Sequence, residues 1–381
     1  MAYKFRKQIF GFMDLLRFKK MVPARRQKLA EGSDKPLPKS YAVNRTAKIL
    51  HPGKQTAVLV EIIEETADTK TFVFSAERPF YFRAGQYITV GCRIGASFAS
   101  RPYAISSSPE AALGGRFSVT IKKCGFFSGY MCDSAAVGDS FTVGEPSGEF
   151  CREPLKDAPH IVAVAGGSGI TPFYSMAQSL KDGTEEGTLT ILYGANRESE
   201  IIFKDALDNL SCDKVKVVYV LSEEDKEGYE HGFISADIIK KYAQGDFTLM
   251  ICGPQALYKY ADTEYKKLGL EARRIKKEAQ CVGTRDAAPA KYKLTVHIGF
   301  EKFVVEADSR ETLLVAMERA GLEVPAKCRA GGCGFCHSRL ISGKFSIAGA
   351  DKRRLADKKF GYIHPCCTYP DSDMEIDVPR G

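Results

Sequence analysis

The chain has 381 residues, of which 44% are hydrophobic and 27% charged, so it is too long for one ordinary domain and too apolar for a disordered protein. The net charge of +8 comes from residues 1–48, which hold 13 basic and three acidic side chains, whereas the other 333 residues hold 42 basic and 44 acidic ones. This confined basicity, with no nucleic-acid-binding motif beside it, argues against a nucleic-acid partner. No apolar run predicts a transmembrane helix or signal peptide, and the 12 irregularly spaced cysteines suit a reducing cytoplasm, where clustered thiols favour a metal over disulfides.

Residues 1–45 are predicted to form a basic extension and linker. Apolar residues recur at helical spacing among lysines and arginines, at Phe5, Ile9, Phe12, Met13 and Leu16. The polar stretch from Pro23 to about Ser40 is typical of a linker. Two interpretations stay open: residues 1–22 form an amphipathic helix that makes a peripheral contact with an anionic membrane, or the same face packs on the core or on a partner.

Three further domains are predicted after the extension. Residues 46–155 contain short strands with turn residues between them, which predicts a small antiparallel β-barrel. Residues 156–288 alternate apolar strands with helix-length segments, which predicts an α/β domain with a parallel sheet. Residues 289–381 begin with a hairpin and a helix, followed by the densest group of cysteines.

The cysteines of the last domain carry the most specific signal. Cys328, Cys333 and Cys336 have the C-x4-C-x2-C spacing of a plant-type [2Fe–2S] ferredoxin, and a fourth cysteine follows at 366 or 367. A zinc site would favour two C-x2-C pairs, and only one is present. Gly361 to Cys366 resembles the ferredoxin pattern G-Y-x-x-x-C, which makes Cys366 the fourth ligand and Cys367 its neighbour.

Two glycine-containing turns in the second domain indicate a nucleotide site. Gly166, Gly167, Gly169 and Thr171 lie in a turn that directly follows the apolar strand 161–165, where a helix N-terminus favours phosphate. Cys252, Gly253 and Pro254 end a later parallel strand, on the side where such sheets bind ligands. The alternative is an ordinary βα turn and a packed cysteine.

The barrel segment holds a third group of candidate residues. Arg101, Pro102, Tyr103 and Ser107 come from one strand and its end, and Gly125 and Ser128 come from a later turn. An arginine can bind a phosphate through two hydrogen bonds, and a tyrosine can stack on a flat ring. Each of them also has an ordinary structural interpretation.

These motifs in this order resemble the ferredoxin–NAD(P)+ reductase superfamily, in the versions with a C-terminal plant-type ferredoxin domain. The resemblance covers residues 55–381 and includes F-R-A-G-Q (82–86) and P-S-G-x-F (146–150) besides the motifs above. It implies that Arg101 binds the flavin phosphate, that Tyr103 lies against the flavin ring, and that Gly125 and Ser128 mark an FAD-type member. It places Thr171 and Cys252 beside the nicotinamide nucleotide and makes the last domain an α+β (β-grasp) ferredoxin domain.

Two positions depart from the family pattern. Ala104 replaces a Ser or Thr that bonds flavin N5, although alignment at the reacting centre of Tyr103, Ala104 and Cys252 matters more for hydride transfer than that hydroxyl. NADPH-preferring members carry Ser-Arg where this chain has Ser222 and Glu223. The carboxylate favours NADH, since it would repel a 2′-phosphate, while Arg197 in the preceding loop favours NADPH.

The implied function is a reductase component that passes electrons from NADH through FAD to a [2Fe–2S] cluster and then to a separate acceptor protein. A hydride carries two electrons and the cluster accepts one, so a flavin must lie between them. The acceptor could be an oxygenase, hydroxylase, desaturase or anaerobic partner. Two alternatives stay open: reverse flow from a low-potential donor to NAD+, and a non-enzymatic redox-sensing module. A pyrimidine-synthesis electron-transfer subunit is disfavoured, because it has a much shorter gap before the fourth cysteine.

Overall fold

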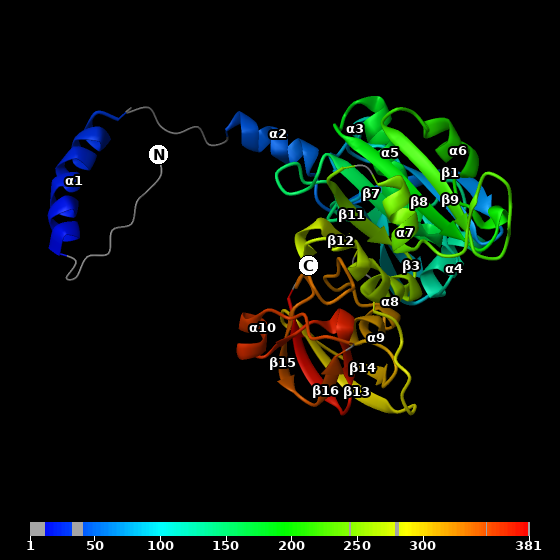
Figure 1. The fold of residues 1–381 in the computed structure, drawn as a ribbon. Coiled ribbons are helices and arrows are strands. Elements are labelled where there is room, and N and C mark those ends of the chain that lie inside the picture. Colours follow the sequence, from blue (N-terminus) through cyan, green and yellow to red (C-terminus); the bar gives the residue numbers. More distant parts are fainter. Residues whose placement is uncertain (1–11, 33–40, 244, 279–281, 348, 380–381) are drawn as a thin grey trace. The chain divides into compact units, whose positions relative to one another are not determined.

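The computed structural model describes residues 12–32, 41–243, 245–278, 282–347 and 349–379 (Figure 1). The chain divides into two compact units, Met1–Lys48 and Ile49–Gly381. Phe5 and Ile9 of the predicted amphipathic helix, and residues 33–40 of the predicted linker, lie outside the described residues. Within the described ranges, no helix is long and apolar enough to cross a bilayer.

The N-terminal unit contains helix α1 (Phe12–Ala30), and helix α2 (Ala42–Leu50) begins in it. Helix α1 continues through Pro23 to Ala30. The prediction that a linker begins at Pro23 is therefore wrong for residues 23–30. Proline removes one backbone donor, but the residues that follow it (ARRQKLA) are mostly strong helix formers. On α1, Leu16, Phe18 and Met21 are 43%, 66% and 65% exposed.

The first sheet of the second unit is a closed antiparallel barrel with strand order β4-β3-β6-β1-β2-β5. A bridge between Ile105 and Val119 joins the two edge strands β4 and β5. Phe74 anchors the core, with its ring 5.2 Å from Phe117 in a stacked arrangement and 5.5 Å from Phe141 edge-on. The bounds are β1 (Gln55–Thr66), β2 (Thr69–Ala76), β3 (Tyr87–Ile94), β4 (Ser97–Ala104), α3 (Pro109–Leu113), β5 (Arg116–Lys122), α4 (Phe126–Asp133) and β6 (Ser140–Val143).

The second sheet is parallel, with strand order β10-β9-β8-β7-β11-β12 and an apolar cluster on each face. Strand β7 is buried along nearly its whole length, as its continuous apolar sequence predicts. The strand order changes direction between β7 and β11, and ligands bind at the carboxyl ends of strands at such a point. The strands are β7 (His160–Gly166), β8 (Thr188–Ala195), β9 (Val215–Leu221), β10 (Glu230–His231), β11 (Phe247–Cys252) and β12 (Ile275–Lys277). The helices are α5 (Thr171–Asp182), α6 (Lys204–Leu210), α7 (Ala236–Tyr242) and α8 (Gln255–Glu264).

The third sheet is mixed, with strand order β14-β13-β19-β15-β17, and packs against helix α9 (Figure 1). Leu294, Val296, Met317 and Ile376 belong to its buried core, which confirms the predicted α+β domain. Helix α9 also packs on β4 of the barrel. The bounds are β13 (Lys291–Ile298), β14 (Glu301–Asp308), α9 (Leu313–Arg319), β15 (Ser338–Ser342), β16 (Phe345–Ile347), α10 (Leu355–Lys359), β17 (Tyr362–Ile363), β18 (Thr368–Pro370) and β19 (Met374–Val378).

Candidate functional site

One cavity of about 430 Å³ lies where the barrel, the parallel sheet and the cysteine loop (residues 328–336) meet. Its volume is within the ordinary range for ligand sites. Residues predicted from three separate motifs line it: Pro102, Tyr103 and Ala104 from the barrel, Gly166, Gly167, Gly169, Thr171, Cys252, Gly253 and Pro254 from the parallel sheet, and Cys328 from the cysteine loop.

The end of strand β4 forms the barrel side of the cavity. Tyr103 pairs with Ile88 and Ala104 pairs with Tyr87 across the β3–β4 ladder, and Tyr87 also lines the cavity. The Tyr103 ring stacks near Phe127, with 6.2 Å between centroids and 28° between planes. This wall presents an aromatic ring to the cavity.

Ser107, Gly125 and Ser128 shape the barrel next to the cavity. The Ser128 hydroxyl accepts hydrogen bonds from the backbone N–H groups of Cys124 and Gly125 at 3.0 and 2.8 Å, which fixes the turn that begins helix α4. Cys124 lines the cavity. The Ser107 carbonyl accepts a 2.7 Å bond from the hydroxyl of Ser175 on α5, so Ser107 ties the barrel to the parallel-sheet domain.

Arg101 is directed toward the third domain. Its Nη1 donates to the Ser100 carbonyl at 2.6 Å and to Oε2 of Glu318 on α9 at 3.0 Å. Burial and the nearby Arg329 lower the pKa of the Arg101 guanidinium. Arg101 is thus beside the cavity and in contact with the cysteine domain.

The glycine turn between β7 and α5 packs tightly on the end of β11. It forms the 3₁₀ turn η1 (Gly167–Ile170), in which a Cβ placed on Gly169 would lie 2.1 Å from the Cys252 carbonyl oxygen. The Thr171 hydroxyl donates to the Ser168 carbonyl at 2.8 Å, and the buried Tyr193 hydroxyl donates to the Gly167 carbonyl at 3.0 Å. Only glycine at 169 allows this approach of the two predicted motifs.

The Cys252 side chain lies in an environment that keeps it protonated. Burial raises the pKa of this thiol well above its ordinary value, and the charge of Glu278 raises it further. Cys252 is therefore a neutral thiol at neutral pH and not a nucleophilic thiolate.

A second cavity of about 580 Å³ adjoins the first along the carboxyl ends of β7, β8 and β9. The two cavities share Lys122, Gly166, Gly167 and Pro254, so they adjoin each other at the glycine turn. Asn196 and Ser222 line the far end of the second cavity. The neighbouring Arg197 and Glu223 pair with each other, with Nε and Oε2 3.2 Å apart.

The four predicted ligand cysteines lie together in the third domain. Cys328, Cys333 and Cys336 lie in the loop between α9 and β15, and Cys366 lies in the 3₁₀ turn η5 (Pro365–Cys367). Cys333 has a hydrogen-bonding contact with Cys328, and Cys366 has such contacts with Cys328 and Cys336. The Cys328 contact and burial raise the pKa of the Cys333 thiol well above its ordinary value.

This set of donors fits a two-iron cluster. Neighbouring thiols do not ionise together unless a cation neutralises them, and a bound metal deprotonates its thiol ligands. A [2Fe–2S] cluster takes two thiolates on each of two irons, which matches the number of cysteines gathered here.

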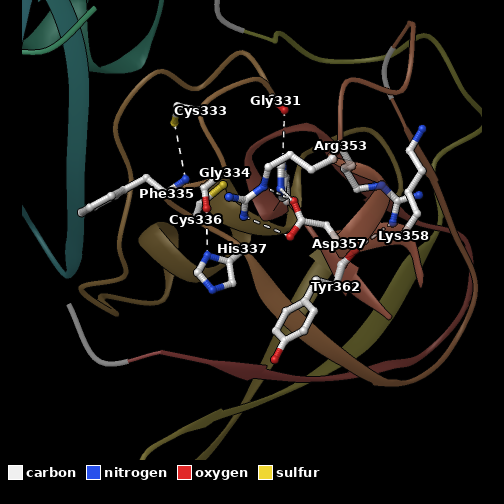
Figure 2. Close-up of polar contacts among 12 residues, drawn as sticks. Gly331, Cys333, Gly334, Phe335, Cys336, His337, Arg353, Asp357, Lys358 and Tyr362 are labelled. Carbon is white, nitrogen blue, oxygen red and sulfur yellow. Dashed lines mark hydrogen bonds and ion pairs between the residues drawn. The ribbon is translucent and has the colours of Figure 1, made fainter. Parts of the chain in front are cut away.

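Polar contacts from α10 and η5 support the cysteine loop. The His364 ring, buried behind the loop, contacts the Gly331 carbonyl at 2.9 Å and Asp357 at 3.2 Å, and Asp357 pairs with Arg354 through both oxygens. Figure 2 shows Asp357 beside the loop, and the His337 ring turned toward the Gly334 carbonyl, 2.8 Å away. These contacts hold the loop in the conformation that places its sulfurs together.

Sequence reasoning missed several residues that line the two cavities. Lys122 lines both cavities, and Tyr87 and Glu278 line the first. Lys122 ends strand β5 three residues before Gly125 of the G-x-x-S turn, a position that could have indicated it. Glu278 follows the basic strand β12 in a charged stretch, where no local pattern distinguishes it from its neighbours.

Three family models match the chain in succession. They are described as an oxidoreductase FAD-binding domain at residues 56–151, an oxidoreductase NAD-binding domain at residues 163–263, and a 2Fe-2S iron-sulfur cluster binding domain at residues 296–371. The chain is therefore an oxidoreductase with FAD, NAD and [2Fe–2S] domains in the predicted order.

Relatives extend this similarity over most of the chain. The chain is 27% identical over 319 residues to NADH oxidoreductase HCR of Escherichia coli, covering 83% of this chain and 95% of that protein. It is 29% identical over 348 residues to the ferredoxin reductase component of 3-ketosteroid-9-alpha-monooxygenase of Mycobacterium tuberculosis, covering 83% of this chain and 93% of the relative.

A solved structure shares the fold. Phthalate dioxygenase reductase, described as a modular structure for electron transfer from pyridine nucleotides to [2Fe-2S], aligns with a TM-score of 0.63 and 22% identity, covering 86% of this chain and 98% of that one. With the three domain matches and the cavity that joins them, this chain belongs to the ferredoxin–NAD(P)+ reductase superfamily, among the members that carry a C-terminal [2Fe–2S] domain.

Proposed function

We propose that the protein is a reductase component that takes electrons from NADH and delivers them, through FAD and a [2Fe–2S] cluster, to a separate protein. The observation that carries this proposal is the shared cavity, which is lined at once by Tyr103 and Ala104, by Gly169 and Cys252, and by the cluster ligand Cys328. Bound FAD and the cluster supply the conversion of a two-electron donor into single electrons. The chain supplies their positions.

On the barrel side, Tyr103 and Ala104 orient the flavin at the reacting centre. Tyr103 offers its ring face to the isoalloxazine, and the small Ala104 leaves space beside it. Arg101 and Pro102 position the flavin phosphate, with Ser107 supporting their strand. Gly125 and Ser128 form the turn for the second phosphate of FAD.

On the nucleotide side, Gly166, Gly167 and Gly169 let the pyrophosphate approach the backbone, and Thr171 opens helix α5 beside it. Gly253 and Pro254 hold Cys252 at the nicotinamide, where a neutral thiol excludes water without competing as a nucleophile. Glu223 selects NADH in two ways: it repels a 2′-phosphate, and it occupies Arg197, the cation that would otherwise attract one.

The acceptor is proposed to be a separate electron-acceptor protein such as a terminal oxygenase component. This proposal draws on the name of the Mycobacterium tuberculosis relative, a ferredoxin reductase component of a monooxygenase. Cys328, Cys333, Cys336 and Cys366 hold the cluster, and Cys333 is exposed toward solvent on the side where a partner could approach. We further propose a cytoplasmic protein with a peripheral membrane contact through residues 1–22.

The test is an anaerobic titration of the purified holoprotein with NADH. We expect one FAD and two irons per chain, with NADH bleaching first the flavin and then the cluster absorption. Cys328→Ser should keep the flavin step and lose the cluster step. Zinc in place of iron, four irons per chain, or a flavin that NADH does not reduce would each contradict the proposal.

A further inference from the structure

Glu318 is a buried carboxylate at the contact between the barrel and the cysteine domain. It lies on helix α9, is 4% exposed, and accepts hydrogen bonds from both domains. From the barrel, Ser100 donates its backbone N–H and its hydroxyl at 3.3 and 3.2 Å, and Arg101 donates Nη1 at 3.0 Å. From its own domain, Arg329 donates Nη1 and Nη2, each at 2.7 Å.

Arg329 connects this carboxylate to the cluster site. It directly follows the ligand Cys328 and is buried, and its backbone has a φ of 51°, which is uncommon for a residue other than glycine. Such a conformation persists only where the surroundings hold it. The two-bond pairing with Glu318 is one such restraint on the residue next to the ligand.

Arg101 connects the same carboxylate to the flavin site. It precedes Tyr103 by two residues on β4, and Tyr103 lines the cavity with Cys328. Helix α9 packs on β4, and the hydroxyl of Ser97 donates to the Arg319 carbonyl at 3.1 Å, which extends the contact along the strand. Glu318 is therefore hydrogen-bonded to Arg101, two residues before Tyr103, and to Arg329, the residue directly after Cys328.

The contact between the barrel and the cysteine domain at Arg101 and Arg329 depends on the negative charge of Glu318. One carboxylate lies between the buried Arg329 guanidinium and the Arg101 guanidinium, whose side chain is 25% exposed, and removing its charge would leave these two like charges facing each other. Removing one partner of a buried ion pair is strongly destabilising, because the remaining charge stays buried without compensation.

We propose that Glu318 is a positioning residue that fixes the cluster ligand loop against the flavin strand and thereby sets the rate at which electrons pass from flavin to cluster. This inference rests on the proposed function. It assigns to Glu318 no contact with substrate or cofactor, and its effect is transmitted through Arg101 and Arg329.

The same interface offers a matched control. Glu323 also belongs to the cysteine domain and pairs with Lys54 and Arg93 of the barrel, at 3.2 and 3.5 Å. Its side chain is 46% exposed, and exposed pairs contribute little because water and salt screen them. Glu318→Gln and Glu323→Gln therefore remove the same charge from one interface at a buried and at an exposed position.

The experiment compares the two variants with the wild-type holoprotein. Stopped-flow absorbance follows flavin reduction by NADH and then cluster reduction, and hydrogen–deuterium exchange follows the backbone amides of β4 and α9. FAD content is measured first, because Arg101, a partner of Glu318, is proposed to position the flavin phosphate. For FAD-loaded Glu318→Gln we expect normal flavin reduction, because Glu318 lines neither of the two cavities of the nucleotide site. Cluster reduction should slow by about tenfold or more, and exchange in β4 and α9 should rise by roughly 100-fold, as expected for a broken buried pair. Glu323→Gln should match wild type in both measurements.

Iron content and the electron paramagnetic resonance spectrum of the reduced protein show whether a variant still holds its cluster. They distinguish slow cluster reduction from loss of the cluster. If Glu318→Gln does not retain its cluster, Glu318→Asp decides, since it keeps the charge but is too short to reach both domains. Wild-type cluster reduction and exchange in Glu318→Asp would then overturn the proposal, as would wild-type values in a cluster-loaded Glu318→Gln. Failure of NADH to reduce the wild-type flavin would instead overturn the proposed function.

Discussion

Cys366 and Cys367 are adjacent and both buried, and their side chains contact each other. Cys366 also contacts Cys328 and Cys336, whereas the Cys367 thiol also donates to the His364 carbonyl at 3.4 Å. Cys367 also lies close to Gly331, where an added Cβ would be 2.8 Å from its sulfur. The contacts with two of the other predicted ligands favour Cys366 as the fourth.

We predict that Cys366→Ser loses the cluster and that Cys367→Ser keeps it. A serine at 366 removes one of four thiolates, and structural metal binding depends on the complete set. Iron, acid-labile sulfide and visible absorption of the two purified variants provide the measurement. Cluster loss in Cys367→Ser alone would exchange the roles of the two residues.

The Arg197–Glu223 pair supports a prediction about nucleotide choice. Glu223→Arg should raise kcat/KM for NADPH relative to NADH by about tenfold, since a charged hydrogen bond of about 1.5 kcal/mol replaces repulsion and Arg197 is released. Steady-state kinetics with both nucleotides measure the ratio. Glu227→Arg, on the same exposed loop, adds the same charge and should leave the ratio unchanged. A wild-type protein that already prefers NADPH would show that our interpretation of Glu223 is wrong.

At the scale of elements, the contact between turn η1 and the end of β11 joins two motifs that lie about 80 residues apart in the sequence. A Cβ placed on Gly169 would lie 2.1 Å from the carbonyl oxygen of Cys252, 2.4 Å from its carbonyl carbon and 2.7 Å from Cα of Gly253. These are backbone atoms, so no side-chain rotation could make space. A side chain at 169 must separate the turn from the strand.

We therefore predict that Gly169→Ala destabilises the protein by about 1–3 kcal/mol, the usual cost of overpacking, and raises KM for NADH. Thermal unfolding and steady-state kinetics are the measurements. Gly129→Ala, in α4 with no atom near its would-be Cβ, should cause neither change. Unchanged stability and KM in Gly169→Ala would contradict the tight packing of η1 on β11.

The sequence predicted those elements whose pattern is local, and missed those that depend on distant contacts. The strand 161–165 lies within β7, because its continuous apolar run suits only a fully buried strand. The continuation of α1 past Pro23 was missed, since one breaker outweighed seven following helix-compatible residues. Short helix α10 was also missed, as it is only five residues long and is held through Asp357 and His364.

The candidate site shows the same limit. The glycine turns and the cysteine loop carry their chemistry in consecutive residues, so their spacing indicated them. The direction of Arg101 could not be predicted, because its partner Glu318 lies 217 residues further along the chain. Glu278 reaches the cavity only through the way the sheets pack.

At the scale of the whole molecule, the N-terminal unit differs from the rest in charge and exposure. It carries all of the excess basic charge, and its apolar side chains Leu16, Phe18 and Met21 are exposed on α1. Basic residues near an anionic surface contribute roughly 1 kcal/mol each, and exposed apolar residues can insert at the interface.

We predict that deleting residues 2–40 abolishes sedimentation with anionic liposomes and leaves NADH-to-dye activity intact. Binding of the full chain should weaken as salt rises, because the attraction is screened. Neutral liposomes serve as the control. Equal binding by both forms would dismiss the membrane contact, and loss of flavin on deletion would show that the extension belongs to the core.

Cys328 lines the cavity that Tyr103 and Ala104 also line, and it lines as well a groove of about 830 Å³ on the side of Phe335 and Lys352. A cluster bound there needs no swing of one domain between a receiving and a delivering position. Electron arrival at the cluster should accordingly be independent of solvent viscosity, and stopped-flow traces in buffer and in sucrose should coincide. A rate that falls in proportion to viscosity would reveal a diffusive domain movement instead.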